Sequence, residues 1–133
     1  FNDNPTMGDF LIRNILGADN DKNIITVGEL LREGQIIQFH LRDSKASSDD
    51  LRNLLTSAKK SELRVDECGA LLFSCLGRGS YLFGKADHDT NMFKEHMGEI
   101  PLTGFFCNGE IGPVAGNTYI HGYTSSIGII RPK

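Results

Sequence analysis

The sequence has 133 residues, of which 39% are hydrophobic and 23% charged, and its net charge is −3. This length fits one domain with a single hydrophobic core. The acidic balance argues against the basic face that binds nucleic acid, and apolar runs such as ALLF and IGII are too short to cross a bilayer. We therefore expect no nucleic-acid partner and no membrane attachment.

The N-terminal part of the chain predicts a short helix and a strand. Thr6 and Asp9 are spaced as an N-cap pair, and apolar residues then recur at helical spacing, which predicts a helix over about residues 7–16. The polar turn ADNDKN leads to an expected strand, IITVG. DNDKN begins like a calcium loop, but Ile24 and Leu30 stand where such a loop needs glycine and glutamate, so we expect a solvated turn without metal.

The segment GQIIQFHLRD, residues 34–43, has the clearest strand pattern. Apolar and polar side chains alternate along it, and His40 and Arg42 share the polar face. Such a face is either the solvated side of a half-buried strand or the wall of a cavity. After the polar segment SKASSDD, leucines at helical spacing predict a helix over residues 51–58.

The rest of the chain predicts mostly strands. GALLFSCLG is an apolar run typical of a buried strand, and a short helix is expected around residues 90–97. Three strands follow near residues 103–110, 117–123 and 125–131. We predict a single α+β domain with a largely antiparallel sheet and two to three helices.

The cysteines are three in number, Cys68, Cys75 and Cys107, and have no metal-site spacing with the four histidines. An odd number without a C-x-x-C pair favours free thiols in a reducing compartment. Because no secretory segment is visible, we expect a cytoplasmic location. We also expect no metal and no cofactor.

The run GFFCNGEIGPVAG, residues 104–116, places Cys107 and Glu110 among glycines. Glu110 has two open interpretations: an exposed turn residue, or a group whose flanking glycines let a ligand approach the backbone. Cys75 and Cys107 each lie in an apolar strand, where a cysteine usually packs as a small hydrophobe. The catalytic alternative pairs one thiol with His121 as base.

Four segments carry a resemblance to a known family: DFLIRNILGAD, VGELLREGQIIQFHLRD, ALLFSCLGRG and PLTGFFCNGEIGPVAGNTYIHGYTSS. They resemble the C-terminal half of the FIST domain, named after F-box and intracellular signal transduction proteins. The resemblance covers residues 1–133 and is most specific at G-F-F-x-x-G-E-I-G-P, followed by His121 and Thr124. It implies a sensory module for small ligands such as amino acids or their derivatives. It also implies an N-terminal FIST half upstream, in a longer chain.

We accordingly expect a ligand-sensing domain without catalysis. Arg42 and His40 are expected to meet an anionic group, Arg42 through a bidentate pair, and Glu110 to meet an amine. The Gly-Arg-Gly turn 77–79 would place Arg78 at the mouth of the pocket. The full expected ligand-binding set is His40, Arg42, Cys75, Arg78, Asn108, Glu110, His121 and Thr124.

Two other functions stay open. The first is an interaction module that docks a protein partner through an exposed surface or sheet edge, and an isolated half of this kind would be able to form a homodimer. A large apolar patch in place of a polar-lined pocket would favour it. The second is a cysteine-dependent enzyme built on Cys75 or Cys107.

Overall fold

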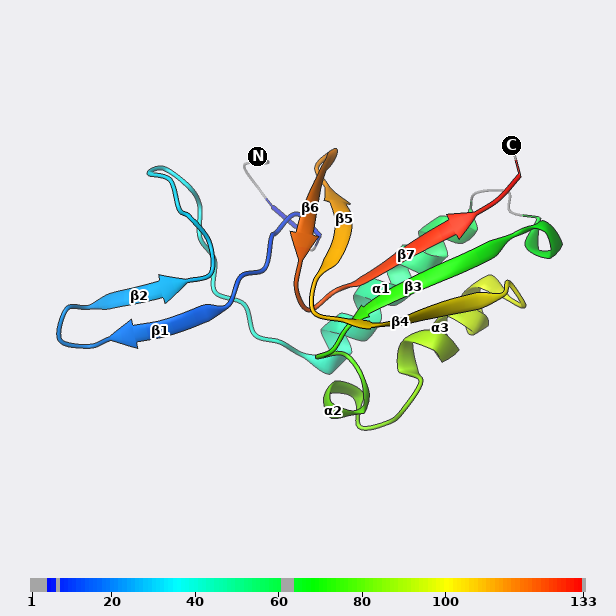
Figure 1. Ribbon diagram of the computed structural model, residues 1–133, viewed down its shortest axis with the longest axis horizontal. Helices are drawn as coiled ribbons and strands as arrows, with labels where there is room; N and C mark the ends of the chain where they lie inside the picture. The colour runs from blue at the N-terminus through cyan, green and yellow to red at the C-terminus, as the bar shows by residue number, and fades with distance from the viewer. Residues whose placement is uncertain (1–4, 7, 61–63, 133) are drawn as a thin grey trace.

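A computed structural model describes residues 5–6, 8–60 and 64–132. The elements, in chain order, are β1 (Ile15–Asp19), β2 (Ile24–Val27), α1 (Ser44–Lys59), η1 (Val65–Glu67), β3 (Gly69–Cys75), α2 (Ser80–Phe83), α3 (His88–Met97), β4 (Leu102–Cys107), β5 (Glu110–Val114), β6 (Asn117–His121) and β7 (Ser125–Ile130). They form an arm (residues 14–43, which include β1 and β2), a body of sheet and helices, and a small hairpin (β5 and β6) beside the body (Figure 1).

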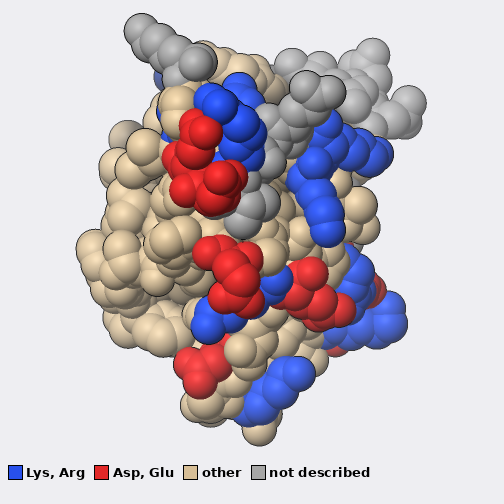
Figure 2. All heavy atoms as spheres, turned by 90° about the vertical axis from the view of Figure 1, so that its right-hand side faces the viewer, with Lys and Arg blue, Asp and Glu red and all other residues tan. Residues whose placement is uncertain are grey.

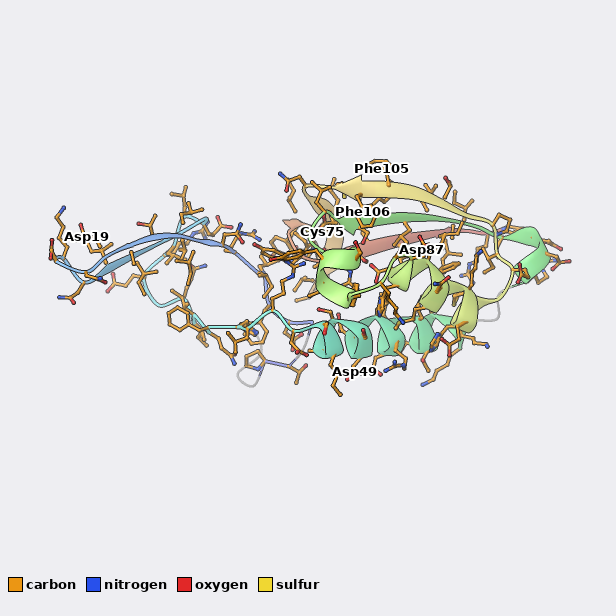
Figure 3. The ribbon with its side chains drawn as sticks, turned by 90° about the horizontal axis from the view of Figure 1, so that it is seen from below. Asp19, Asp49, Cys75, Asp87, Phe105 and Phe106 are labelled. Atoms are coloured by element: carbon orange, nitrogen blue, oxygen red, sulfur yellow. The ribbon has the colours of Figure 1, made fainter. Side chains whose placement is uncertain are left out.

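The body is a three-stranded sheet with helices on one face. The central strand β3 pairs parallel with β4 and antiparallel with β7. Figure 3 shows α1 and α3 on the same side of this sheet. The core lies between the two layers and includes Leu51, Leu55, Ala70, Met92, Phe93, Met97 and Ile100.

The other face of the sheet is open. Phe105 on β4 is 63% exposed and Ile130 on β7 is 64% exposed. The ring of Phe105 packs edge-to-face on Phe73 of β3, with 5.2 Å between the ring centroids. Its neighbour Phe106 points to the helix side (Figure 3), because side chains alternate along a strand.

Helix α1 begins at a defined cap and faces the core with its leucines. The Asp43 side chain accepts a hydrogen bond from the backbone N–H of Ala46 at 2.7 Å, which satisfies one of the free donors at the helix start. Leu51 and Leu55 are buried one turn apart on the same face. The helix is thereby anchored against the sheet.

The arm is a two-stranded hairpin that extends away from the body (Figure 1). β1 and β2 pair antiparallel, and residues 14–43 are exposed apart from the half-buried Val27. The base of the arm is held by an ion pair between Arg13 and Glu29, with 2.7 Å between Nε and Oε2. The arm therefore buries little apolar surface of its own.

The structure confirms most of the predicted elements. The α+β class, the helix over residues 51–58, the strand in GALLFSCLG, the strand in IITVG, the helix near residues 90–97 and strands within 103–110, 117–123 and 125–131 are present. The helix α1 already begins at Ser44, so SKASSDD is helical, and the strands β1 and β5 were not predicted. The polar turn at residues 20–23 is exposed, as expected. Of the four strand pairs described, three are antiparallel and one, between β3 and β4, is parallel.

Two predicted elements are wrong. In the helix predicted over 7–16, residue 7 lies outside the described residues, and residues 8–16 form no helical turn. The expected contact is nevertheless made, because the Thr6 N–H and hydroxyl both donate to Asp9, at 2.8 and 3.0 Å. Residues 34–43 form no strand, since no neighbouring strand in the described part of the chain pairs with them. A short helix and a single strand are each stable only when their apolar side packs on a neighbouring element, and the described part of the chain offers neither segment such a neighbour.

The surface in Figure 2 carries charges of both signs. Lysine and arginine side chains lie beside aspartate and glutamate side chains on this face. Oppositely charged side chains also pair on α1, where Lys45 and Arg52 both contact Asp49, each at 2.6 Å. Among the residues that the structure describes, no helix has the length and apolar character needed to span a membrane.

Candidate functional site

A groove of about 430 Å³ opens where the base of the arm meets the carboxyl ends of the body strands. This volume lies in the range of small-molecule sites. The polar or reactive side chains in its wall come from four segments: Arg13, Asn14, Cys75, Asn108, His121 and Tyr123. The groove therefore joins residues that are more than a hundred positions apart in the sequence.

His121 ends β6 and lines the groove. Its Nε2 lies 2.9 Å from the carbonyl oxygen of Gly112 on the paired strand β5. A carbonyl only accepts, so Nε2 must carry the proton and donate. In the neutral ring Nδ1 is then an acceptor, available to a donor such as an amine or an amide N–H.

Arg42 lies at the rim of this groove. Its guanidinium carbon is 4.8 Å from the ring centroid of Tyr123, and a Cβ added at Gly77 would lie 2.6 Å from its Nη2. Both neighbours line the groove. Within the described part of the chain Arg42 has no carboxylate partner, so its hydrogen-bond donors are available to an anionic group.

Arg13, by contrast, is held in the wall. Besides its ion pair with Glu29, it donates from Nη1 to the carbonyl oxygens of Ile12 at 3.0 Å and Ile120 at 3.3 Å. These contacts tie the arm to β6. The groove thus has one arginine that is fixed by protein partners and one that is not.

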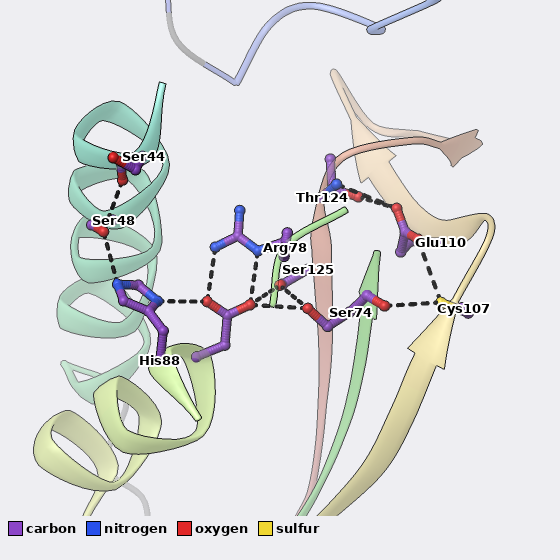
Figure 4. A network of polar contacts seen from close by, with 10 residues as sticks. Ser44, Ser48, Ser74, Arg78, His88, Cys107, Glu110, Thr124 and Ser125 are labelled. Carbon is purple, nitrogen blue, oxygen red and sulfur yellow. Dashed lines mark hydrogen bonds and ion pairs between the residues drawn. The ribbon is translucent and has the colours of Figure 1, made fainter. Parts of the chain in front are cut away.

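A buried polar network lies between the central sheet and the helices (Figure 4). Arg78 donates to both carboxylate oxygens of Asp89, from Nε at 2.7 Å and from Nη2 at 3.0 Å. The hydroxyls of Ser74 on β3 and Ser125 on β7 donate to the same carboxylate at 2.9 and 2.7 Å. One carboxylate thereby connects the start of α3 with two strands and the turn after β3.

His88 extends the network to α1. Its Nδ1 lies 2.9 Å from Asp89, its Nε2 lies 2.8 Å from the hydroxyl of Ser48, and its ring stacks on Phe83 with 3.6 Å between the centroids. A Ser–His–Asp order can indicate a nucleophile. Here the Ser48 hydroxyl donates to the carbonyl of Ser44 at 2.9 Å, and the carboxylate is already paired with arginine. We therefore interpret the chain of contacts as structural.

Glu110 is 1% exposed and ties β5 to the start of β7. Its Oε2 accepts from the N–H and the hydroxyl of Thr124, at 3.3 and 2.9 Å, and its Oε1 accepts from the thiol of Cys107 at 3.4 Å (Figure 4). Burial raises the pKa of the Cys107 thiol, and the neighbouring Glu110 raises it further. The thiol therefore keeps its proton at neutral pH.

The structure brings four of the expected ligand-binding residues to one place. Cys75, Asn108 and His121 lie in the wall of the groove, and Arg42 lies at its rim. They come from the end of β3, the turn after β4, the end of β6 and the segment before α1. Sequence spacing gave no means of knowing that these ends converge.

The other four expected residues lie elsewhere. His40 does not line the groove; it is exposed, and its ring packs against Phe10 at 4.6 Å. Arg78 is 5% exposed and is directed to its buried carboxylate instead of a pocket mouth. Glu110 and Thr124 bind each other. The polar atoms of Arg78, Glu110 and Thr124 are bound by protein partners, and His40 does not line the groove, so we leave these four residues out of the candidate ligand site.

The buried network was not predicted from the sequence. The position of His88 near a polar helix suggests an exposed residue, whereas its side chain is 8% exposed, and no sequence pattern marks Asp89, Ser74 or Ser125. One weak signal was present, because Arg78 lies three residues after a buried strand and an arginine that is buried there needs a carboxylate nearby. The sequence does not say which of the many acidic residues supplies it.

Comparison with known proteins places these observations in a family. The family model for the FIST C domain matches residues 2–113. An uncharacterized protein of Mycobacterium tuberculosis is 46% identical over 125 residues, which is 94% of this chain and 32% of that protein. An uncharacterized protein of Mycobacterium bovis is 45% identical over 125 residues, with the same shares of the two chains.

A plant protein is also similar. An F-box/LRR-repeat protein of Arabidopsis thaliana is 31% identical over 113 residues, covering 80% of this chain and 20% of that protein. The chain spans about a third of the length of the mycobacterial relatives it matches. On the strength of the matched residues, the chain belongs to the FIST C domain family, a family of signal transduction domains.

Proposed function

We propose that this chain is the ligand-sensing domain of a signal transduction protein and that it binds a small carboxylate, such as an amino acid or its derivative, without catalysis. The observation that carries the proposal is the groove of about 430 Å³ with an arginine at its rim that has no carboxylate partner in the described part of the chain. The family membership supports the signalling context.

The groove offers complementary groups to such a ligand. The guanidinium of Arg42 can form a bidentate pair with a carboxylate, and Nδ1 of a neutral His121 ring can accept from an amine N–H. Asn108 lies in the groove wall, in the turn between β4 and β5, and its side-chain amide supplies both a donor and an acceptor. Charge-assisted hydrogen bonds contribute about 1.5–3 kcal/mol each, so a few of them suffice for selectivity between related metabolites.

The test is a thermal-shift screen against amino acids, their N-acyl derivatives and dicarboxylates. A ligand at 100 times its Kd adds about 2.7 kcal/mol, which is several degrees for a domain of this size. We expect hits confined to carboxylates and lost in Arg42→Gln. Arg32→Gln on the exposed arm is the matched control and should keep the shift. A blank screen on folded protein would count against the proposal.

A second candidate function is favoured by the open face of the central sheet. We propose that this face docks an N-terminal FIST half. Phe105 and Ile130 are exposed there, β4 is an edge strand, and the mycobacterial relatives are about three times as long as this chain. Exposed apolar residues on an open sheet are typical of a covered interface.

This second candidate has its own experiment. The part of the Mycobacterium tuberculosis relative that lies outside the matched residues would be mixed with this chain as a separate protein. Hydrogen exchange of the chain would then be measured with and without that protein. We expect protection along β4 and loss of binding in Phe105→Glu, whereas Leu54→Glu, on the exposed side of α1, should bind normally. Protection of α1 alone would contradict the proposal. A dimer of the chain alone in sedimentation would indicate that a second copy occupies the face.

A further inference from the structure

Two of the three cysteines face each other across the parallel strands. Cys75 and Cys107 are register partners and are the last residues of β3 and β4. Neighbouring strands lie about 4.8 Å apart, and register partners point to the same face. Backbone positions that are about 4.4–6.8 Å apart allow a disulfide. All three thiols are free in this structure.

The two thiols have different surroundings. Cys75 is 7% exposed and forms part of the groove wall, so a small reagent that enters the groove meets this residue. Cys107 does not line the groove; its thiol donates to Glu110 at 3.4 Å and lies 3.7 Å from the carbonyl oxygen of Ser74. Cys75 is thus the buried cysteine that borders the groove, and Cys107 is the half-buried cysteine whose thiol is held beside a buried carboxylate.

We propose that Cys75 and Cys107 form a modification site: a dithiol that a hydroperoxide converts reversibly to a disulfide beside the groove. The pair needs no ligand in the groove, so this proposal stands apart from the sensing function. Glu110 is the positioning residue, because its Oε1 holds the thiol of Cys107 through the hydrogen bond described above.

The chemistry balances in two steps. The Cys75 sulfur attacks the outer oxygen of the hydroperoxide, the O–O bond breaks, and a sulfenic acid and one molecule of water or alcohol result. The Cys107 sulfur then attacks the sulfenic sulfur, its proton passes to Glu110, and the leaving hydroxide takes up a proton to become water. The peroxide gains two electrons and the two thiols lose them. A small dithiol reverses the change by thiol–disulfide exchange.

Cys68 supplies an internal control. It is buried at the opposite end of β3, among core residues under the helices. Trypsin would leave Cys68 and Cys75 in one peptide, residues 65–78. The experiment therefore uses Cys68→Ser as its background, so that any disulfide found has a single assignment.

The test treats folded protein with one equivalent of hydrogen peroxide and then blocks free thiols with iodoacetamide in denaturant. In Cys68→Ser we expect a mass loss of about 2 Da, no alkylation, and a cross-link between peptide 65–78 and the peptide of Cys107. In the double variant Cys68→Ser, Cys107→Ser we expect no cross-link and a sulfenic acid at Cys75, about 16 Da heavier, that dimedone captures.

A second reagent tests the proximity of the thiols without oxidation. Phenylarsine oxide bridges two neighbouring thiols, and we expect one equivalent to bind reduced Cys68→Ser and to protect both cysteines from alkylation. Glu110→Gln should reach the same disulfide more slowly than the parent, provided that its circular dichroism shows a folded chain. The proposal is overturned by sulfinic acid at either cysteine without a cross-link, by a disulfide between two chains, or by failure of the arsenical to bind.

Discussion

Arg78 donates two hydrogen bonds to Asp89, at 2.7 and 3.0 Å, and both side chains are buried. The arginine comes from the turn after β3 and the aspartate from the first turn of α3. Ser74 and Ser125 donate to the same carboxylate from two strands of the sheet. The pair therefore fixes how α3 sits on the sheet, next to the strand end that forms the groove.

The first prediction concerns this pair. Asp89→Asn keeps the shape of the side chain but leaves a buried guanidinium without its counter-charge, which typically costs about 3–5 kcal/mol. We expect a loss of that size in the free energy of unfolding measured with urea. Asp87→Asn, two residues earlier and exposed, should change stability by less than about 0.5 kcal/mol. Equal stability of the two variants would mean that the pair contributes little.

The second prediction concerns acid. Burial tends to raise the pKa of Asp89, but the hydrogen bonds and charge of Arg78, with those of His88 and Ser125, outweigh it and hold this pKa well below its usual range. In the unfolded chain an aspartate titrates near pH 3.9. The pair therefore stabilises the fold above that pH, and the contribution is lost as the pH falls toward the lower, folded-state pKa.

The measurement is the urea midpoint between about pH 5 and pH 2.5, the window in which unfolded aspartate takes up its proton. The parent chain should lose stability steadily across this window. Asp89→Asn should lose less, since it lacks the group with the depressed pKa. Parallel pH profiles for the two chains would show that other carboxylates govern the acid response.

Hydrophobic periodicity predicted a helix or strand correctly where that element packs its apolar face into the core of this chain. Leu51 and Leu55 predicted α1, and the apolar run around Leu72 predicted β3, because each packs into the core seen here. The alternation in residues 34–43 is equally regular, yet that segment lies exposed in the arm. A periodic pattern indicates which face of an element can be buried, but it does not indicate which part of the molecule covers that face.

The candidate site was less predictable for a related reason. His121, Asn108 and Cys75 were chosen for their chemistry, and the groove joins them only because three strand ends converge there. Glu110 was chosen on the same ground, but its oxygens are bound by Thr124 and Cys107. Residue type alone does not separate a polar group that binds ligand from one that holds the fold together.

The third prediction tests the structural role of Thr124. Thr124→Val preserves shape and removes the hydroxyl that donates to Glu110 at 2.9 Å. Loss of a hydrogen bond to a buried carboxylate costs about 1–3 kcal/mol, which we expect in urea unfolding. Thr118→Val, at an exposed position of β6, is the control and should be nearly neutral. A stable Thr124→Val chain would reopen a ligand role for this residue.

The fourth prediction concerns the close approach of β3 and β4. A Cβ added at Gly104 would overlap the carbonyl oxygen of Leu72 on the neighbouring strand, and backbone cannot move aside as a side chain can. We expect Gly104→Ala to lower the free energy of unfolding by about 1–3 kcal/mol or more. Gly128→Ala on β7 has open space around the new methyl group, so it should be tolerated. Equal stability of both variants would contradict the observed register of the two strands.

The last prediction follows from the exposed arm. Local opening is easiest where backbone buries little apolar surface, and residues 14–43 are almost wholly exposed. Brief trypsin treatment should therefore cut first at Lys22 and Arg32, before any site in α1 such as Arg52. Mass spectrometry of the early fragments identifies the order of cleavage. First cuts within α1 would mean that the body opens before the arm. The same cuts show whether the arm takes part in docking an N-terminal FIST half. If that half covers the open face of the sheet alone, adding it should leave the cuts at Lys22 and Arg32 unchanged. Protection of these two sites would place the arm inside the interface.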